Sequence, residues 1–159
     1  MPTAEERLAA LGIILSEPVP GRPSVVPVAR YGDLAFVSSR GPTVDDDGRR
    51  YTGRVGLDRS SEEAYRAARL TGLNLLAILR AELGSLDRVT RCLKVTGLVN
   101  GAPGFTATAA VLDGCSDLLV EVFGPEIGRH ARTAPGVAEL PNDYPVAFDL
   151  VVAVNADRR

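Results

Sequence analysis

The feature that most constrains the fold of this chain is a long helical pattern between Ser60 and Gly84. Ser60 and Glu63 have the spacing of a capping box, and Gly84 supplies a C-terminal stop. An apolar stripe at helical spacing is formed by Ala64, Ala67, Ala68, Leu75, Ile78 and Leu79, whereas Leu70, Leu73, Leu76 and Ala77 lie off it. Because the second half is apolar nearly all round, we expect it to be covered on two sides.

Strand-like segments and a second helical pattern surround this helix. Strands are predicted over residues 25–31, 34–38, 91–100, 131–140 and 145–155, and a helix over 105–123 with an interruption near Asp113-Gly114. The last strand is apolar on both faces apart from Asp149, which suits the centre of a sheet. This order predicts an α+β domain in which the two helices pack on one face of a mixed sheet.

The segment before the first strand is predicted to be an arm. Residues 4–11 can form a short helix, and the prolines within 17–23 break helix and favour extended chain. We therefore divide the chain into an N-terminal helix and arm, residues 1–24, and a domain, residues 25–157.

The composition is that of one soluble globular domain. The chain has 159 residues, of which 45% are hydrophobic and 24% charged. A net charge of -2 offers no basic surface for nucleic acid, and no apolar run is long enough to span a membrane. One histidine and two cysteines are too few for a disulfide framework or a convincing zinc site. Because the N-terminus lacks signal-peptide order, we expect a cytoplasmic protein.

Arg132 is the candidate ligand-binding residue that the pattern itself indicates. It lies in a stretch of small residues just before the buried last strand, where a cation is costly to desolvate without an anion. Its planar guanidinium matches a carboxylate at two points. The residue type therefore predicts a receptor for a small acid, and it leaves open a structural ion pair with one of the chain's own Asp or Glu residues.

Three short motifs resemble those of a known family. They are Ala131-Arg132-Thr133 followed by Leu140-Pro141, Gly84-Ser85-Leu86-Asp87-Arg88-Val89, and Val37-Ser38-Ser39-Arg40-Gly41-Pro42. On these motifs the chain is identified as a member of the Rid/YjgF family of reactive-intermediate deaminases, formerly named L-PSP endoribonucleases or translation inhibitors. The segments 101–113 and 116–124 are typical of a divergent branch.

The resemblance implies a fold, an assembly and an activity. The fold would be chorismate-mutase-like, and the chain would form a homotrimer with a site in each cleft between subunits. Relatives hydrolyse enamines and imines of amino acids, such as 2-aminoacrylate, to keto acids and ammonia. The arginine that matches Arg132 binds the substrate carboxylate, and neither a cofactor nor a metal is implied.

The chain departs from the family pattern at the positions that surround the substrate. The family tyrosine falls on Val25, the glycine of Ser-Gly-Gln on Ser39 and its glutamine on Arg40. The glutamate that helps to place water falls on Ala147, and the site asparagine falls on Cys115. Val25, Ser39 and Ala147 are thus expected to line the substrate site with few polar groups.

Three residues are candidates to supply the missing chemistry. Cys115 is a candidate nucleophile or wall residue, provided that Arg132 or protonated His130 lowers its pKa; the alternative is a small buried helix residue. His130 is a candidate acid–base with Glu121 as its partner, or else a hydrogen-bonded structural group. Glu121 could replace the family glutamate, or be an exposed helix charge.

Two functions are favoured over a third. The first is a hydrolase that deaminates enamine or imine carboxylates held by Arg132 in an intersubunit cleft. The second is a non-catalytic trimer that binds or senses small carboxylates. The acidic charge balance and the lack of an aromatic and basic surface argue against a ribonuclease.

Overall fold

The computed structural model describes residues 1–18 and 20–155. Along the chain the elements are α1 (Ala4–Ala10), β1 (Val28–Tyr31), β2 (Leu34–Arg40), α2 (Ser61–Leu83), η1 (Leu86–Arg88), β3 (Val89–Asn100), α3 (Thr108–Gly128), β4 (Ala131–Thr133), β5 (Gly136–Val137), η2 (Pro141–Asp143) and β6 (Val146–Val154). The two η elements are short 3-10 helices. The predicted end of the domain at residue 157 lies outside the described residues.

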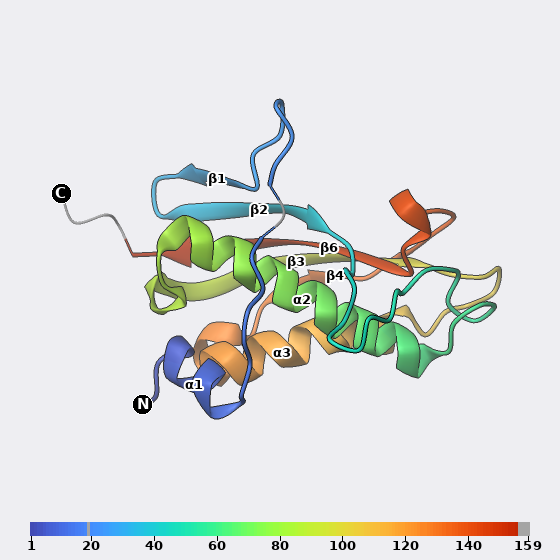
Figure 1. The fold of residues 1–159 in the computed structure, drawn as a ribbon, viewed down its shortest axis with the longest axis horizontal. Coiled ribbons are helices and arrows are strands. Elements are labelled where there is room, and N and C mark those ends of the chain that lie inside the picture. Colours follow the sequence, from blue (N-terminus) through green and yellow to red (C-terminus); the bar gives the residue numbers. More distant parts are fainter. Residues whose placement is uncertain (19, 156–159) are drawn as a thin grey trace.

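The strands form one mixed sheet in the order β1-β2-β6-β3-β4, with β5 also paired to β3 (Figure 1). β3 runs parallel to β4 and β5 and antiparallel to β6. β6 lies between β2 and β3, and Phe148, Leu150 and Val152 on it are fully buried. The prediction that the apolar last strand is central is therefore confirmed.

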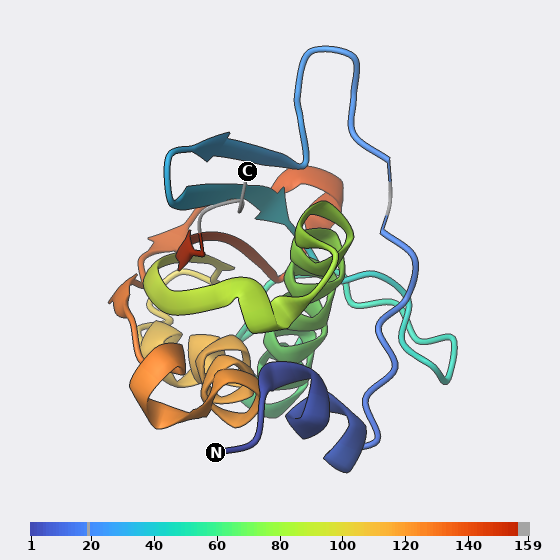
Figure 2. The same cartoon turned by 90° about the vertical axis from the view of Figure 1, so that its left-hand side faces the viewer.

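The helices form a layer on one face of this sheet, as predicted (Figures 1 and 2). α2 begins at its capping box: the Ser60 hydroxyl accepts from the Glu63 N–H at 3.1 Å, and the Glu63 carboxylate accepts from the Ser60 N–H at 2.9 Å. α2 ends at Gly84, which adopts a left-handed conformation with φ of 79°. Leu76 and Ala77, off the main stripe, are buried as well, so more than one side of α2 is covered.

α2 and α3 approach each other closely through glycines. A Cβ built on Gly114 of α3 would lie 2.1 Å from the carbonyl oxygen of Tyr65 on α2. A Cβ on Gly72 of α2 would lie 2.9 Å from Leu118 Cδ2 and 3.2 Å from Cys115 Sγ. The helix pair thus depends on the missing side chains of both glycines.

The predicted interruption of α3 at Asp113-Gly114 is wrong. The helix runs through both residues, because Gly114 serves the contact with α2 rather than ending the helix. The non-helical residue is Gly124, with φ of 79° and ψ of 165°, and one further helical segment follows it as far as Gly128. Gly124-Pro125 therefore marks a kink instead of the predicted end.

The structure also corrects the number of helices and the length of the late strands. Only two helices were assigned to the packed layer, but α1 contacts α3, and Ala4 and Leu8 belong to the main core. The predicted strand over 131–140 is two short strands, β4 and β5, separated by Ala134-Pro135. Proline has no N–H to donate to a ladder, which explains this division.

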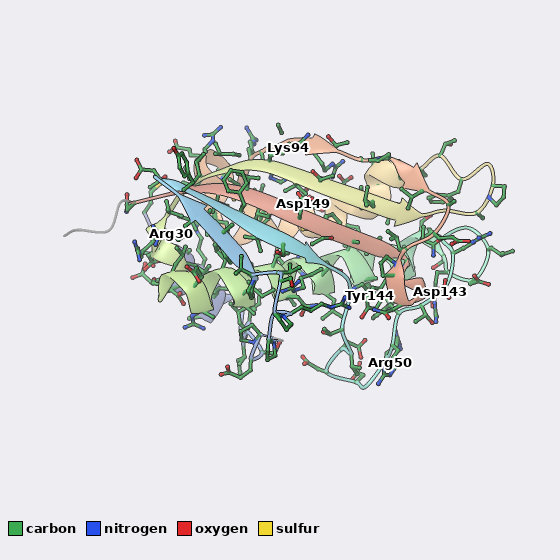
Figure 3. All side chains as sticks on the ribbon, turned by 90° about the horizontal axis from the view of Figure 1, so that it is seen from above. Arg30, Arg50, Lys94, Asp143, Tyr144 and Asp149 are labelled. Carbon is green, nitrogen blue, oxygen red and sulfur yellow. The ribbon has the colours of Figure 1, made fainter. Side chains whose placement is uncertain are left out.

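Among the described residues, no helix covers the opposite face of the sheet (Figure 2). Phe36 on β2 pairs in register with Val151 on β6, which in turn pairs with Lys94 on β3. Phe36 is 44% exposed, and Lys94 and Asp149 lie on the sheet seen from above (Figure 3). Within the described part of the chain, no helix is both long and apolar enough to cross a bilayer.

Candidate functional site

The predicted site residues do not form one group: Arg132 and His130 lie in one place, and Val25, Ser39 and Ala147 in another. Arg132 lies on the edge strand β4, and His130 immediately precedes it. Val25, Ser39 and Ala147 line a cavity bordered by β2, the start of β6 and α2. β4 and β2 are separated by β3 and β6, which places the two strands about 14 Å apart. One chain therefore does not bring these two groups of residues together.

Arg132 is held by residues of α3. Its Nη1 donates to Asp113 Oδ1 at 2.8 Å and to Ser116 Oγ at 3.0 Å, and its Nη2 donates to the carbonyl oxygen of Ala109 at 3.3 Å. Asp113 and Ser116 are three residues apart, so they share one face of the helix. The Arg132 side chain is 20% exposed and that of Asp113 is 48% exposed.

His130 extends this network by one residue. Its Nδ1 lies 2.7 Å from the carbonyl oxygen of Gly128, which can only accept, so Nδ1 carries a proton. Burial lowers the pKa of His130, and Arg132 adds to this effect against the raising influence of the Gly128 carbonyl. In the neutral ring, Nε2 accepts from the Ser116 hydroxyl at 3.0 Å.

The sequence left two roles open for Arg132, a receptor for a small acid and a structural ion pair, and the hydrogen bonds of its guanidinium bear on both. The ion pair with Asp113 is the structural partner that the sequence left open, but it reaches Arg132 through Nη1 alone. No described residue accepts from Nε, and Nη2 makes only the long bond to Ala109. The Nε–Nη2 edge presents two parallel N–H donors and can receive a carboxylate in two-point pairing. Asp113 and Ser116 thus hold the guanidinium and leave that edge open.

Cys115 does not have the surroundings of a nucleophile. It is fully buried between α2 and α3, next to Gly72. Burial raises the pKa of Cys115 to about 12; Cys92 adds to the rise and Arg132 opposes it. The thiol is therefore protonated at neutral pH, and the small buried helix residue is the description that fits.

Glu121 lies outside the Arg132 network. Its carboxylate pairs with Arg69 of α2 at 2.6 Å, and its side chain is 39% exposed. The partners of His130 are Ser116 and Gly128, so the predicted pairing of His130 with Glu121 is wrong. The two residues were proposed as partners from residue type alone, and α3 presents Glu121 to α2 instead.

The cavity bordered by β2, β6 and α2 has a volume of about 520 Å³. Val25, Ser39 and Ala147 line it together with Arg40 and Asn74. Of these five side chains, those of Val25 and Ala147 can neither donate nor accept a hydrogen bond. Its other walls include Ala77 and Ile78 of α2, the arm on either side of position 19 and the turn around Tyr144, which is labelled in Figure 3.

The polar residues Asp113, Ser116 and Asn74 were not singled out as site residues from the sequence, and Arg40 was noted only as the residue at the family glutamine position. The spacing of Asp113 and Ser116 on a helix was a signal that could have paired them, but nothing local indicated that Arg132 faces them.

Among the described residues, no group of three or more His, Cys, Asp or Glu side chains is placed to hold a metal ion.

Comparison with known proteins identifies the family. A family model described as "YjgF/chorismate mutase-like, putative endoribonuclease" matches residues 5–146. Protein TCP17 of Trypanosoma cruzi is 39% identical over 148 residues, which cover 93% of this chain and 92% of that protein.

Solved structures agree with this match. Atu1372 from Agrobacterium tumefaciens, a protein of unknown function, is 36% identical with a TM-score of 0.84, and the match covers 96% of this chain and 94% of that one. A Shewanella oneidensis MR-1 protein with the same endoribonuclease description is 31% identical with a TM-score of 0.89, covering 96% and 100%. The chain therefore belongs to the YjgF/chorismate-mutase-like family and has its α+β fold.

Proposed function

We propose that this protein is a small-molecule hydrolase that deaminates enamine or imine carboxylates in a cleft between subunits of a trimer. One subunit contributes Arg132 and its neighbour contributes the cavity lined by Val25, Ser39 and Ala147. The observation that carries the proposal is the open Nε–Nη2 edge of Arg132, held in place by Asp113 and Ser116. The separation of Arg132 from the cavity within one chain supports a shared cleft.

The proposed reaction needs few catalytic groups from the protein. The iminium carbon is electrophilic, so water adds to the C=N bond to give a carbinolamine. A proton moves from oxygen to nitrogen, the C–N bond breaks, and ammonia leaves as the C=O bond forms. Arg132 orients the acid end of the substrate, which places the reacting carbon and the water in productive geometry.

A non-catalytic binder of small carboxylates is the second candidate. It is favoured by the cavity itself, because Val25 and Ala147 cannot move a proton and Cys115 lies buried away from it. Each missing acid–base group typically costs about 10²–10⁴-fold in rate. We therefore expect weak turnover of 2-aminoacrylate from a hydrolase of this kind and none from a binder.

An assay of the keto acid product separates the two candidates. A lyase generates 2-aminoacrylate in the presence of the protein, and pyruvate release is followed over the spontaneous rate. A slow rate above background that Arg132→Lys abolishes supports the hydrolase. A rate equal to background in wild type, with retained binding of pyruvate, supports the binder.

Arg132→Lys tests the receptor itself by calorimetry with pyruvate or 2-oxobutyrate. Lysine keeps the charge and loses the two-point fork, so affinity should fall by about 1–3 kcal/mol. Arg69→Lys is the matched control, because Arg69 pairs with Glu121 outside the Arg132 network. Equal affinities for wild type and Arg132→Ala would assign Arg132 a purely structural role.

A further inference from the structure

We infer that Arg40 is a second anion-binding group of the cleft, so that the ligand is a dianionic small acid with one acid group at Arg132 and the other at Arg40. The part played by Arg132 rests on the proposed function above. The part played by Arg40 rests on the cavity of a single chain, and four observations support it.

The first observation is a bulge in β2 that turns Arg40 into the cavity. Val37 pairs with Leu150, and the next pair is Arg40 with Phe148, so β2 has one extra residue here. Successive side chains of a regular strand point to opposite faces, yet Ser39 and Arg40 both line the cavity. Bulges of this kind redirect a side chain next to a site.

The second observation is that the backbone after Arg40 is fixed from two sides. Asn74 of α2 donates from Nδ2 to the carbonyl oxygen of Gly41 at 3.1 Å, and Thr43 donates to Asn74 Oδ1 at 3.3 Å. From the other side, the ring of Tyr144 lies so close that a Cβ on Gly41 would be 2.2 Å from it. Because the backbone that carries Arg40 is fixed in this way, it needs little ordering when the side chain binds a ligand.

The third observation is the unbalanced charge of Arg40. Its guanidinium donates from Nη1 to the Ser39 carbonyl at 3.0 Å, and it forms no ion pair with any described Asp or Glu. Partial burial lowers the pKa of Arg40, and no carboxylate offsets that effect. The other charged residues that line the cavity are Glu17 and Arg22. Both are exposed, and their charges are opposite to each other and cancel. An anion at Arg40 would supply the missing counter-charge.

The fourth observation is the separation of the two arginines. Arg132 pairs with Asp113 and lies on β4, three strands away from β2, so one small ligand cannot contact both arginines within one chain. In the proposed cleft the two guanidinium groups come from different subunits. They would bind two acid groups of one ligand, and a cavity of about 520 Å³ has room for more than a three-carbon acid.

The test compares two keto acids with the same five-carbon chain. 2-Oxoglutarate carries a second carboxylate, which 2-oxopentanoate lacks. By calorimetry at fixed ionic strength, wild type should bind 2-oxoglutarate at least tenfold more tightly. Arg40→Gln should bring the two affinities within twofold of each other, whereas Arg132→Lys should weaken both. Arg50→Gln removes an exposed arginine outside the cavity (Figure 3) and should keep the tenfold preference.

The outcomes separate this inference from the proposed function. Equal affinities in wild type, or a preference that survives Arg40→Gln, would overturn the role of Arg40 and leave Arg132 intact. Arg40-dependent binding of 2-oxoglutarate that Arg132→Lys does not change would overturn the role of Arg132 and the dianionic ligand. Binding of neither acid would overturn both. Circular dichroism of each variant establishes that the fold is retained.

Discussion

At the scale of single residues, burial changes the protonation of the two cysteine thiols. Cys92 and Cys115 are both buried, and burial raises the pKa of each thiol from 9.0 to about 12. Between these two pKa values, both thiols stay protonated in the folded chain and are ionised in the unfolded chain. Their contribution to stability is complete below pH 9 and falls as the pH rises from there through 12.

This difference predicts a steep loss of stability in alkali. Between pH 8 and pH 10 the two thiols together should reduce the free energy of unfolding by roughly 3 kcal/mol. Urea denaturation at several pH values should show this extra slope in wild type and not in the double variant Cys92→Ala/Cys115→Ala. Parallel pH profiles for the two proteins would mean that the thiols are accessible in the folded state.

At the scale of elements, the contact between α2 and α3 decides the packing of the helical layer. Alanine is a better helix former than glycine, so Gly114→Ala in an isolated helix would stabilise it by about 1 kcal/mol. Here a Cβ would lie 2.1 Å from the Tyr65 carbonyl, and the helices would have to separate. We therefore expect Gly114→Ala to lower the free energy of unfolding by about 1–3 kcal/mol.

Thermal and urea unfolding of Gly114→Ala measure this effect. Gly101→Ala is the matched control, because a Cβ there would meet its nearest neighbour, Phe105, at an ordinary 3.5 Å. The control should change stability by less than about 0.5 kcal/mol. A stabilised Gly114→Ala protein would show that helix propensity, and not the close contact, governs this position.

At the scale of the whole molecule, the uncovered face of the sheet predicts self-association. Phe36 lies beside Val151 on that face, where a second subunit would bury both. We predict a homotrimer in sedimentation experiments at micromolar concentration. Phe36→Glu should produce monomers, since it would place an unpaired charge in the interface.

Val44→Glu provides the control for this prediction. Val44 is 43% exposed, close to the 44% of Phe36, but it lies in the loop before α2 rather than on the sheet. Val44→Glu should therefore remain trimeric. A monomeric wild-type protein would contradict both the trimer and the shared cleft, and the cavity at Arg40 would then be complete within one subunit.

The sequence by itself determined the elements whose causes are local. The capping box at Ser60, the left-handed stop at Gly84 and the apolar run of β6 each depend on neighbouring residues, so they were predictable. It also indicated that Arg132 needs an anion, because a guanidinium before a buried strand requires one.

The tertiary structure alone decided which residues meet. Arg132 pairs with Asp113, 19 positions earlier in the chain, because the parallel pairing of β4 with β3 places it beside α3. Gly114 lies inside a helix because α2 passes close to it, although local propensity predicted a break. The orientation of Arg40 depends on how β2 and β6 align across their bulge. Contacts between distant segments follow from packing of the whole chain, which no local pattern records.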